Sequence, residues 1–281
     1  MLLIIEALLL ISAVQDQRHA ADGQILPLDM ADTSVDDQFD GCLKKMERRV
    51  QTEFLKKEMT TNSVFATAWR DAENNHTTPG DNLSKNHSVA IYTYTNSEIL
   101  NLNLYQKFNN DVRSDKQKYK DGTYSWYSLH FWLTEAIQIL KKTQNKCYNT
   151  YRGTNVDFDK NVKGREVRFG QFASSSLNRS VAEVFGTISC FEIYTCKGAD
   201  VANYSRFPEE KEVLIPPYET FTVRDVKVKY MYNPDLWCDT VYTLESYSTR
   251  SDLNCAASSG NQVAFLNALL ILIVFCSVVS Y

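Results

Sequence analysis

The sequence predicts an α+β fold in which helices come first along the chain and strands follow. Apolar residues recur at helical spacing as far as Lys142, whereas turn-separated β-rich runs occupy the chain after Cys147. The 281 residues are 44% hydrophobic and show no repeat, linker or low-complexity segment, so they suffice for one large domain. A net charge of −4 without a basic stripe argues against nucleic-acid binding.

Helical periodicity is found in three parts of the chain. Residues 40–69 alternate apolar positions with charges and predict two consecutive helices. Residues 99–110 are predicted to form a further helix. The clearest helix covers residues 129–142, where apolar residues mark one face and two lysines suit the C-terminus.

Strands are predicted where β-branched and aromatic residues gather in short runs bounded by turns. The first run lies among the predicted helices, and the others follow Cys147. We expect strands at residues 89–95, 149–152, 166–169, 190–195, 212–215, 219–230 and 240–247.

The N-terminus predicts export. Residues 1–21 form an apolar segment typical of a signal peptide, although Glu6 interrupts it and no basic residue precedes it. The alternative is a buried N-terminal helix.

The C-terminus predicts a lipid anchor. Small residues at 256–260 precede an apolar run at 263–281, and no basic residue follows that run. This is the pattern of a GPI-attachment signal, with attachment at about residues 256–259; a plain membrane anchor is the alternative. The chain would then comprise a signal peptide (1–21), a catalytic domain (22–255) and a removed attachment signal (256–281).

Sequons and cysteines fit an exported protein. Removal of the tail takes Cys276 with it and leaves six cysteines, an even number whose pairing the sequence alone does not determine.

No histidine pair has zinc-ligand spacing and no Gly-rich dinucleotide fingerprint occurs, so neither a metal site nor a Rossmann-type site is expected. Glycosylation is predicted at Asn75, Asn82, Asn86, Asn178 and Asn203.

Two glutamates are the first candidates for catalysis. Glu210 and Glu212 lie where a charged segment runs into an apolar strand that stops at Pro216-Pro217. Residues two apart in an extended segment point to the same face, so the carboxylates should repel each other unless a cation or polar substrate group lies between them. The alternative is a solvated acidic turn.

Several stretches, taken in order along the chain, match one family. They are residues 28–31, 36–39 with 41–42, 90–95, 129–136, 151–154, 169–172 with 174–177, and 210–216. The chain resembles the vertebrate ecto-ADP-ribosyltransferases that modify arginine, GPI-anchored ectoenzymes that share a core with arginine-modifying bacterial toxins. The resemblance covers about residues 28–247 and includes a complete Arg, Ser-x-Ser and Glu-x-Glu set.

The resemblance implies a fold and a reaction. The fold would be the toxin-like ADP-ribosyltransferase fold, with N-terminal helices followed by a mainly antiparallel β core of two sheets. The enzyme would transfer the ADP-ribose of NAD+ or NADP+ to arginine side chains of extracellular or cell-surface proteins and release nicotinamide. NAD+ would be a consumed substrate, and no cofactor is implied. Two alternatives stay open: an NAD+ glycohydrolase, and a catalytically silent surface binding protein.

The resemblance also implies a location. The protein would lie on the extracellular face of the plasma membrane, held there by its lipid anchor, and a secreted form is the variant of this expectation.

Four residues would carry the reaction by this resemblance. Glu212 would stabilise the oxocarbenium-like ribose that remains when nicotinamide departs. Glu210 would hold and deprotonate the attacking guanidinium. Arg152 would hold NAD+, and Ser174 would position the nicotinamide ribose and Glu212. A surface or packing role is the alternative for each.

The resemblance further implies substrate contacts and disulfides. Tyr204, with Phe207, would lie on the loop that meets the acceptor protein. The implied disulfides are Cys147–Cys196 and Cys42–Cys238, which leave Cys190 and Cys255 to pair or to stay free. The implied substrate-binding residues are Tyr151, Gly153, Gln171, Ser176 and Phe207.

Overall fold

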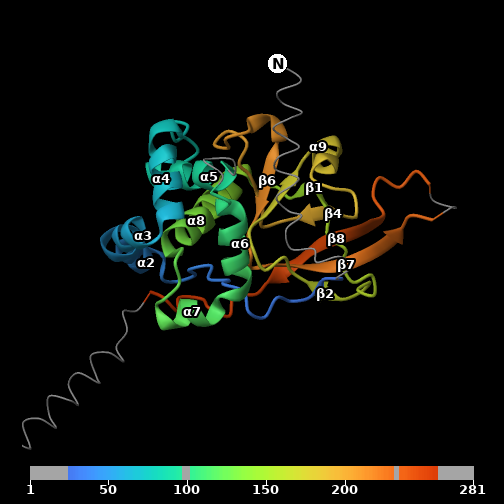
Figure 1. Cartoon of the computed structure of the whole chain (residues 1–281), viewed down its shortest axis with the longest axis horizontal. Coiled ribbons are helices and arrows are strands. Elements are labelled where there is room, and N and C mark those ends of the chain that lie inside the picture. The colour runs from blue at the N-terminus through green and yellow to red at the C-terminus, as the bar shows by residue number, and fades with distance from the viewer. Residues whose placement is uncertain (1–24, 97–101, 231–233, 259–281) are drawn as a thin grey trace, which may run out of the picture.

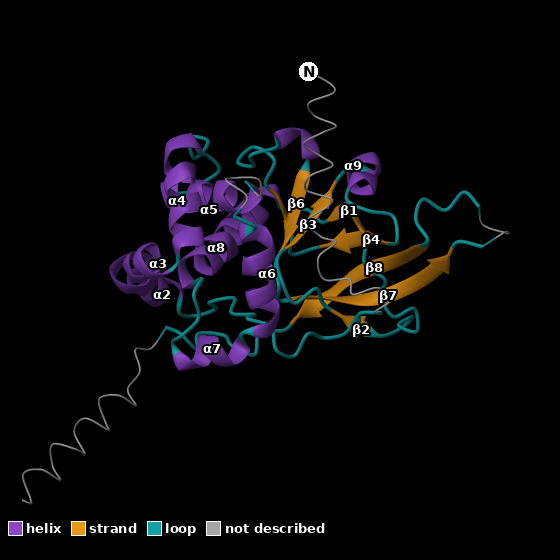
Figure 2. Ribbon diagram, in the orientation of Figure 1, coloured by secondary structure: helices purple, strands orange, loops and turns teal. Residues whose placement is uncertain are grey.

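The computed structural model describes residues 25–96, 102–230 and 234–258, which form a helical half beside a β-sheet half (Figures 1 and 2). The predicted signal peptide and most of the predicted attachment signal lie outside these residues. No helix among the described residues is long and apolar enough to cross a membrane.

The helical half confirms two of the three predicted helical regions. The region 40–69 forms α2 and α3, which a π-helical segment joins, and most of α4; the region 129–142 forms α8. Of the region 99–110, residues 99–101 lie outside the described residues, and α6 begins at Leu104, directly after Asn103 in a left-handed conformation. The described helices are α2 (Leu43–Arg49), η2 (Val50–Phe54), α3 (Leu55–Thr61), α4 (Ser63–Asn75), α5 (Lys85–Thr95), α6 (Leu104–Ser114), α7 (Lys116–Asp121), α8 (Tyr127–Gln144) and α9 (Arg179–Val184).

The prediction of a strand at residues 89–95 is wrong, because this segment belongs to α5. A capping box between Ser84 and His87 starts the helix. Val89, Ile91 and Tyr94 are fully buried, and the helix packs against α4 and α8. A helix surrounded by protein needs no polar face, so its sequence cannot be told from that of a buried strand by periodicity.

Within the described residues the strands form a single eight-stranded sheet in the order β2-β7-β8-β4-β1-β3-β6-β5. The pairings are antiparallel except between β4 and β8. The expected division into two sheets is therefore wrong in its hydrogen bonding, because β4 pairs with both β1 and β8. The strands are β1 (Tyr148–Thr154), β2 (Glu166–Val167), β3 (Ala173–Ser176), β4 (Ser189–Thr195), β5 (Ala199–Asp200), β6 (Glu212–Ile215), β7 (Glu219–Val228) and β8 (Thr240–Thr249).

Two hydrophobic cores lie on opposite faces of the sheet. Phe172 and Leu214 join the core shared with the helices, whereas their neighbours Ala173 and Ile215 join a second core with residues of β4, β7 and β8. This alternation follows the two-residue period of a strand. The strands β3 and β6 therefore present one face to the helical half of the molecule.

Three disulfides are present among the described residues, and they correct one of the two implied pairings. Cys147–Cys196 is confirmed. Cys42–Cys238 is wrong, since Cys42 pairs with Cys255 and Cys190 pairs with Cys238. The reason is that the C-terminal segment lies along the N-terminal one: the backbone N–H of Asp40 donates to the Asn254 side chain (2.8 Å), which brings Cys255 beside Cys42.

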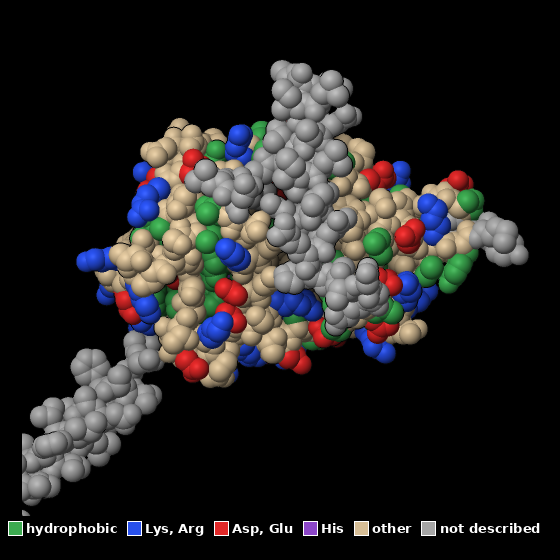
Figure 3. Space-filling view, viewed as in Figure 1, with side chains coloured by type: hydrophobic (Ala, Val, Ile, Leu, Met, Phe, Trp, Pro, Cys, Tyr) green, Lys and Arg blue, Asp and Glu red, His purple; other side chains and the backbone are tan. Residues whose placement is uncertain are grey.

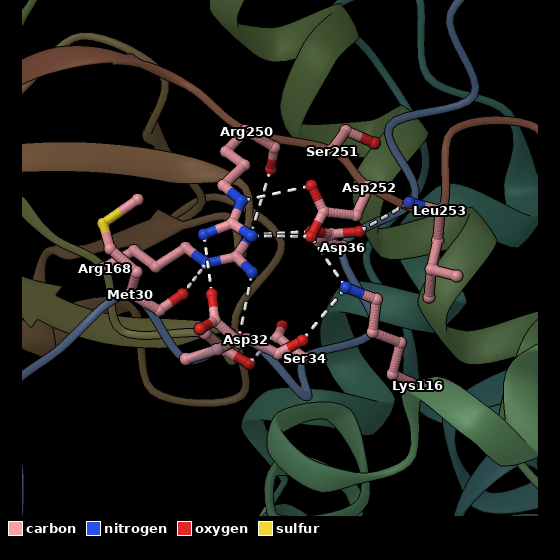
Figure 4. Close-up of polar contacts among 12 residues, drawn as sticks. Met30, Asp32, Ser34, Asp36, Lys116, Arg168, Arg250, Ser251, Asp252 and Leu253 are labelled. Atoms are coloured by element: carbon pink, nitrogen blue, oxygen red, sulfur yellow. Dashed lines mark hydrogen bonds and ion pairs between the residues drawn. The ribbon is translucent and has the colours of Figure 1, made fainter.

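A buried ion pair joins these terminal segments to the sheet (Figure 4). Arg168 and Asp36 are both fully buried, 2.7 Å apart, and Arg168 also donates to the carbonyl oxygens of Ala31 and Arg250. The second oxygen of Asp36 accepts from the backbone N–H of Leu253 (2.9 Å). Hydrogen bonds of this kind satisfy the charges that burial would otherwise leave costly.

Candidate active site

The β3–β6 ladder brings three of the predicted residues together. Ser176 lies opposite Glu212 and Ser174 lies opposite Leu214 in this antiparallel pair. Alternate residues of a strand share a face, so both serines and Glu212 lie on the face whose Leu214 enters the helical core. This face of the ladder is the foundation of the candidate site.

Glu212 is a buried carboxyl, with 5% of its surface exposed. Burial raises its pKa to about 7, while a hydrogen bond from Ser174 and the positive charge of Arg152 act in the opposite direction. The negative charge of Asp200 adds to the rise. A carboxyl poised near neutrality among a hydroxyl, a guanidinium and an acid is typical of catalytic sites.

Arg152 of β1 supplies the cation of the site. Its guanidinium Nη1 donates to the carbonyl oxygen of Ser174 (2.8 Å) and lies 3.5 Å from the hydroxyl of Tyr105. These contacts hold a fixed positive charge beside Glu212. A planar guanidinium is also well suited to bind phosphate.

Ser176 connects β3 to the loop before β6. Its hydroxyl donates to the carbonyl oxygen of Glu210 (2.6 Å) and accepts from the backbone N–H of Asn178 (2.9 Å). The serine that lies opposite Glu212 thus also fixes the backbone of Glu210.

Glu210 does not belong to the extended segment that the sequence suggested. It ends a 3₁₀ turn, Pro208–Glu210, and Lys211 then adopts a left-handed conformation with φ 49°. The strand begins only at Glu212. The prediction that the two carboxylates share a face by strand alternation is therefore wrong, and Glu210 is partly exposed while Glu212 is buried.

The loop before the glutamates has one buried and one accessible aromatic residue. Tyr204 is 4% exposed, and its hydroxyl donates to Asp81 (2.7 Å), so it packs the loop onto the segment before α5. Phe207 is half-buried, and the guanidinium of Arg206 lies 5.3 Å from the centre of its ring. Phe207 rather than Tyr204 is accessible near Glu210.

Three other predicted substrate contacts lie on β1 or just before β3. Tyr151 packs against Trp237, with ring centres 6.1 Å apart, and strand alternation directs it to the opposite face of β1 from Arg152. A Cβ at Gly153 would lie 2.3 Å from the carbonyl oxygens of Ala182 and Gly186, so only glycine permits this approach of α9 to β1. Gln171 is half-buried just before β3.

The structure adds Tyr94, Tyr105 and Asn109, which sequence reasoning missed. The hydroxyl of Tyr94 lies 3.4 Å from that of Ser174 and accepts from the amide of Asn109 (3.1 Å). The available signal was the family-like stretch 90–95, but its assignment to a strand concealed where Tyr94 points.

A polar cavity of about 630 Å³ opens beside α9. Tyr151, Asn178, Arg179 and Lys211 help to line it, whereas Glu212, Arg152 and Ser174 do not. The cavity therefore borders the candidate site and is distinct from its buried carboxyl.

The five asparagines predicted to carry glycans differ in their exposure. Asn75, Asn82, Asn178 and Asn203 are exposed, and Asn86 is half-buried.

Acidic and basic side chains are interspersed on the face shown in Figure 3. Within the described ranges, no three His, Cys, Asp or Glu residues form a group that could hold a metal ion.

Comparison with known proteins connects this geometry to a reaction. The family described as "NAD:arginine ADP-ribosyltransferase" matches residues 28–234. The GPI-linked NAD(P)(+)--arginine ADP-ribosyltransferase 1 of Mus musculus is 36% identical over 251 residues, which are 83% of this chain and 73% of that protein. The Oryctolagus cuniculus protein of the same name is 32% identical over 319 residues, 98% of this chain and 94% of that protein.

Solved structures show the same likeness. The crystal structure of the eukaryotic mono-ADP-ribosyltransferase ART2.2 matches with a TM-score of 0.66 and 31% identity, over 82% of this chain and 98% of that one. A variant of ART2.2 in complex with NADH matches with a TM-score of 0.67 and 30% identity over the same shares.

Proposed function

This chain belongs to the NAD:arginine ADP-ribosyltransferase family, and from that premise we propose that it transfers the ADP-ribose of NAD+ to arginine side chains and releases nicotinamide. The observation that carries the proposal is the buried Glu212, on which Ser174 and Arg152 act. Glu210 lies two residues earlier, in a separate 3₁₀ turn. NAD+ is a substrate in this proposal, and no cofactor is required.

Glu212 provides the charge that the first step requires. Loss of the cationic nicotinamide leaves an oxocarbenium-like ribose, a type of transition state that glycosidases stabilise with a carboxylate. A negative charge in a buried site acts more strongly on such a centre than one in water. Arg152 supports the same step in two ways, because it favours the ionised form of Glu212 and offers a planar cation to the phosphates.

Glu210 provides acceptor recognition. An arginine guanidinium stays protonated at neutral pH, so it attacks efficiently only when a partner orients it and removes a proton. Glu210 is partly exposed, and its backbone is held by Ser176. A large acceptor protein can therefore approach its carboxylate without entering the buried part of the site.

The place of action in this proposal is the cell surface. A signal peptide at residues 1–21 directs export, and a GPI signal within 256–281 provides the anchor. The GPI-linked relatives support this arrangement. Release of the protein from intact cells by phosphatidylinositol-specific phospholipase is the expected result, and a mature chain that retains a C-terminal tag and stays membrane-bound would contradict it.

One incubation tests the activity. The protein is mixed with NAD+ labelled in its adenylate half and with agmatine, a small guanidine. Labelled ADP-ribosyl-agmatine is the expected product. Free ADP-ribose alone would identify an NAD+ glycohydrolase, and unchanged NAD+ would favour a silent binding protein.

A further inference from the structure

A buried tyrosine connects the helical half to the candidate site. Tyr94 of α5 is fully buried, and its hydroxyl lies 3.1 Å from the carbonyl oxygen of Phe172, one of two groups that can accept its single proton. The same hydroxyl accepts from Asn109 of α6 (3.1 Å) and lies 3.4 Å from Ser174 Oγ of β3. Three elements thus meet at one hydroxyl directly behind the serine of the site.

The protons of this cluster can be assigned to useful positions. Ser174 has one hydroxyl proton, which can point to Tyr94 or to Glu212. The Tyr94 oxygen already accepts from Asn109, so the Tyr94 proton can serve Phe172 or Ser174. When Tyr94 donates to Ser174, the serine proton is directed to Glu212. The hydrogen bonds from Asn109 to Tyr94, from Tyr94 to Ser174 and from Ser174 to Glu212 then all run toward the carboxylate.

Packing alone explains this arrangement poorly. The Oδ1 atom of Asn109 is buried without a hydrogen-bond partner, and such an atom lowers stability. An apolar residue at position 109 would fill the space without that loss. Polar groups that cost stability yet converge on a reactive group are typical of functional sites.

We propose that Tyr94 and Asn109 are positioning residues that orient the Ser174 hydroxyl toward Glu212. This inference rests on the function proposed above. The arrangement moves no proton between groups during the reaction and breaks no bond. It holds one hydroxyl in the direction that keeps Glu212 ionised while charge develops on the ribose.

The charged groups that act on Glu212 do not include the Tyr94 hydroxyl. Ser174 of β3, Arg152 of β1 and Asp200 of β5 are the polar or charged groups that act on Glu212. The Tyr94 ring packs against Tyr105, with centres 5.2 Å apart, and a phenylalanine keeps that contact. Tyr94→Phe therefore acts on Glu212 through Ser174 alone.

The experiment is a double-mutant cycle with a matched control. Tyr94→Phe and Ser174→Ala are made singly and together, and kcat and KM for NAD+ are measured with agmatine and with water as acceptor. Tyr127→Phe is the control, because Tyr127 is also buried and its hydroxyl donates to the backbone carbonyl oxygen of Tyr119 (2.6 Å) without contacting the site.

Tyr94→Phe is expected to lower kcat about tenfold for both acceptors and to leave KM within about twofold. In the Ser174→Ala background it should cause no further loss of kcat, because the hydroxyl that Tyr94 orients is already absent. Tyr127→Phe should lower the melting temperature without lowering kcat. An equal loss of kcat in both backgrounds, or an unchanged kcat in Tyr94→Phe, would overturn the inference.

A second measurement separates this inference from the proposed function. The Glu212 carboxyl is followed through a pH titration by carbon-13 NMR, with Glu212→Gln for assignment. Its pKa should rise in Tyr94→Phe and stay unchanged in Tyr127→Phe. This readout needs no turnover, so an enzyme inactive with both acceptors would refute the function while the titration still decides the role of Tyr94.

Discussion

Ser176 holds the carbonyl oxygen of Glu210 at 2.6 Å while it lies opposite Glu212 in the β3–β6 ladder. One serine thus sets the spacing between a glutamate in a 3₁₀ turn and a glutamate in a strand. The two carboxylates come from different backbone environments, one partly exposed and one buried. Different chemical roles follow from this difference, and they can be tested separately.

Glu210→Gln is expected to abolish transfer to agmatine and to retain most NAD+ hydrolysis. Water needs no carboxylate to orient it, whereas a guanidinium must be held and deprotonated. Both products are measured in one assay with labelled NAD+. A proportional loss of transfer and hydrolysis would mean that Glu210 supports Glu212 or NAD+ binding instead.

Glu212→Gln is expected to lower both transfer and hydrolysis by about 100-fold or more, since both need the charge that stabilises the ribose. Glutamine keeps the size of the side chain, so binding of NAD+ should change little. Steady-state rates and equilibrium binding provide the two measurements. Retention of more than a few per cent of the turnover would exclude Glu212 from the catalytic role.

The pH dependence of stability should reveal the buried state of Glu212. Burial raises its pKa from 4.5 to about 7. A carboxyl of this kind stabilises the fold while it is protonated, and the contribution is lost as pH rises through about 7. Glu212→Gln should therefore raise the free energy of unfolding at pH 8 by up to about 3 kcal/mol relative to the wild type. Its melting temperature should be higher accordingly.

Scanning calorimetry at pH 5 and pH 8 checks this expectation, with Glu210→Gln as the control at a partly exposed glutamate. The difference between Glu212→Gln and the wild type should shrink at pH 5, where the wild-type carboxyl is protonated. An equal difference at both values of pH would show that Glu212 is not destabilised by ionisation in the fold.

The disulfide Cys42–Cys255 should be the most important of the three for stability. It joins residues 213 positions apart and fastens the C-terminal segment to the N-terminal one. Cys255→Ser, paired with Cys42→Ser, should lower the free energy of unfolding by about 5 kcal/mol in the chain-entropy model. Urea titration measures the change. Peptide mapping without reduction should recover Cys42 with Cys255, and a Cys42–Cys238 peptide would contradict the structure.

Strong local patterns predicted much of the fold. The α8 helix was recognised from apolar residues at helical spacing, and the strands β1, β4, β6, β7 and β8 were recognised from short β-rich runs bounded by turns. The strand β3 was missed because three serines carry no such pattern. The α5 helix was mistaken for a strand because residues 89–95 are mostly buried, and their β-branched and aromatic residues show no polar face at helical spacing.

Some features of the candidate site could be predicted from the sequence, and others could not. Arg152, Ser174 and the two glutamates could be named from residue types and their order. The pairing of Cys42 with Cys255 could not be derived, since it depends on the C-terminal segment lying along the N-terminal one. Nor could Asn109, which comes from a different helix than Tyr94 and meets it only after folding.

The sequence by itself determined the class of the fold, the family and the residue types available for the reaction. These depend on neighbours in the chain and on short patterns that survive without three-dimensional information. Only the tertiary structure decided which of these residues are buried, what they contact and how strongly they hold a proton. The pKa of Glu212 depends on removal from water and on Ser174, Arg152 and Asp200, which reach it from three different strands. These contacts form only when the chain folds, so the sequence of any one strand does not determine them.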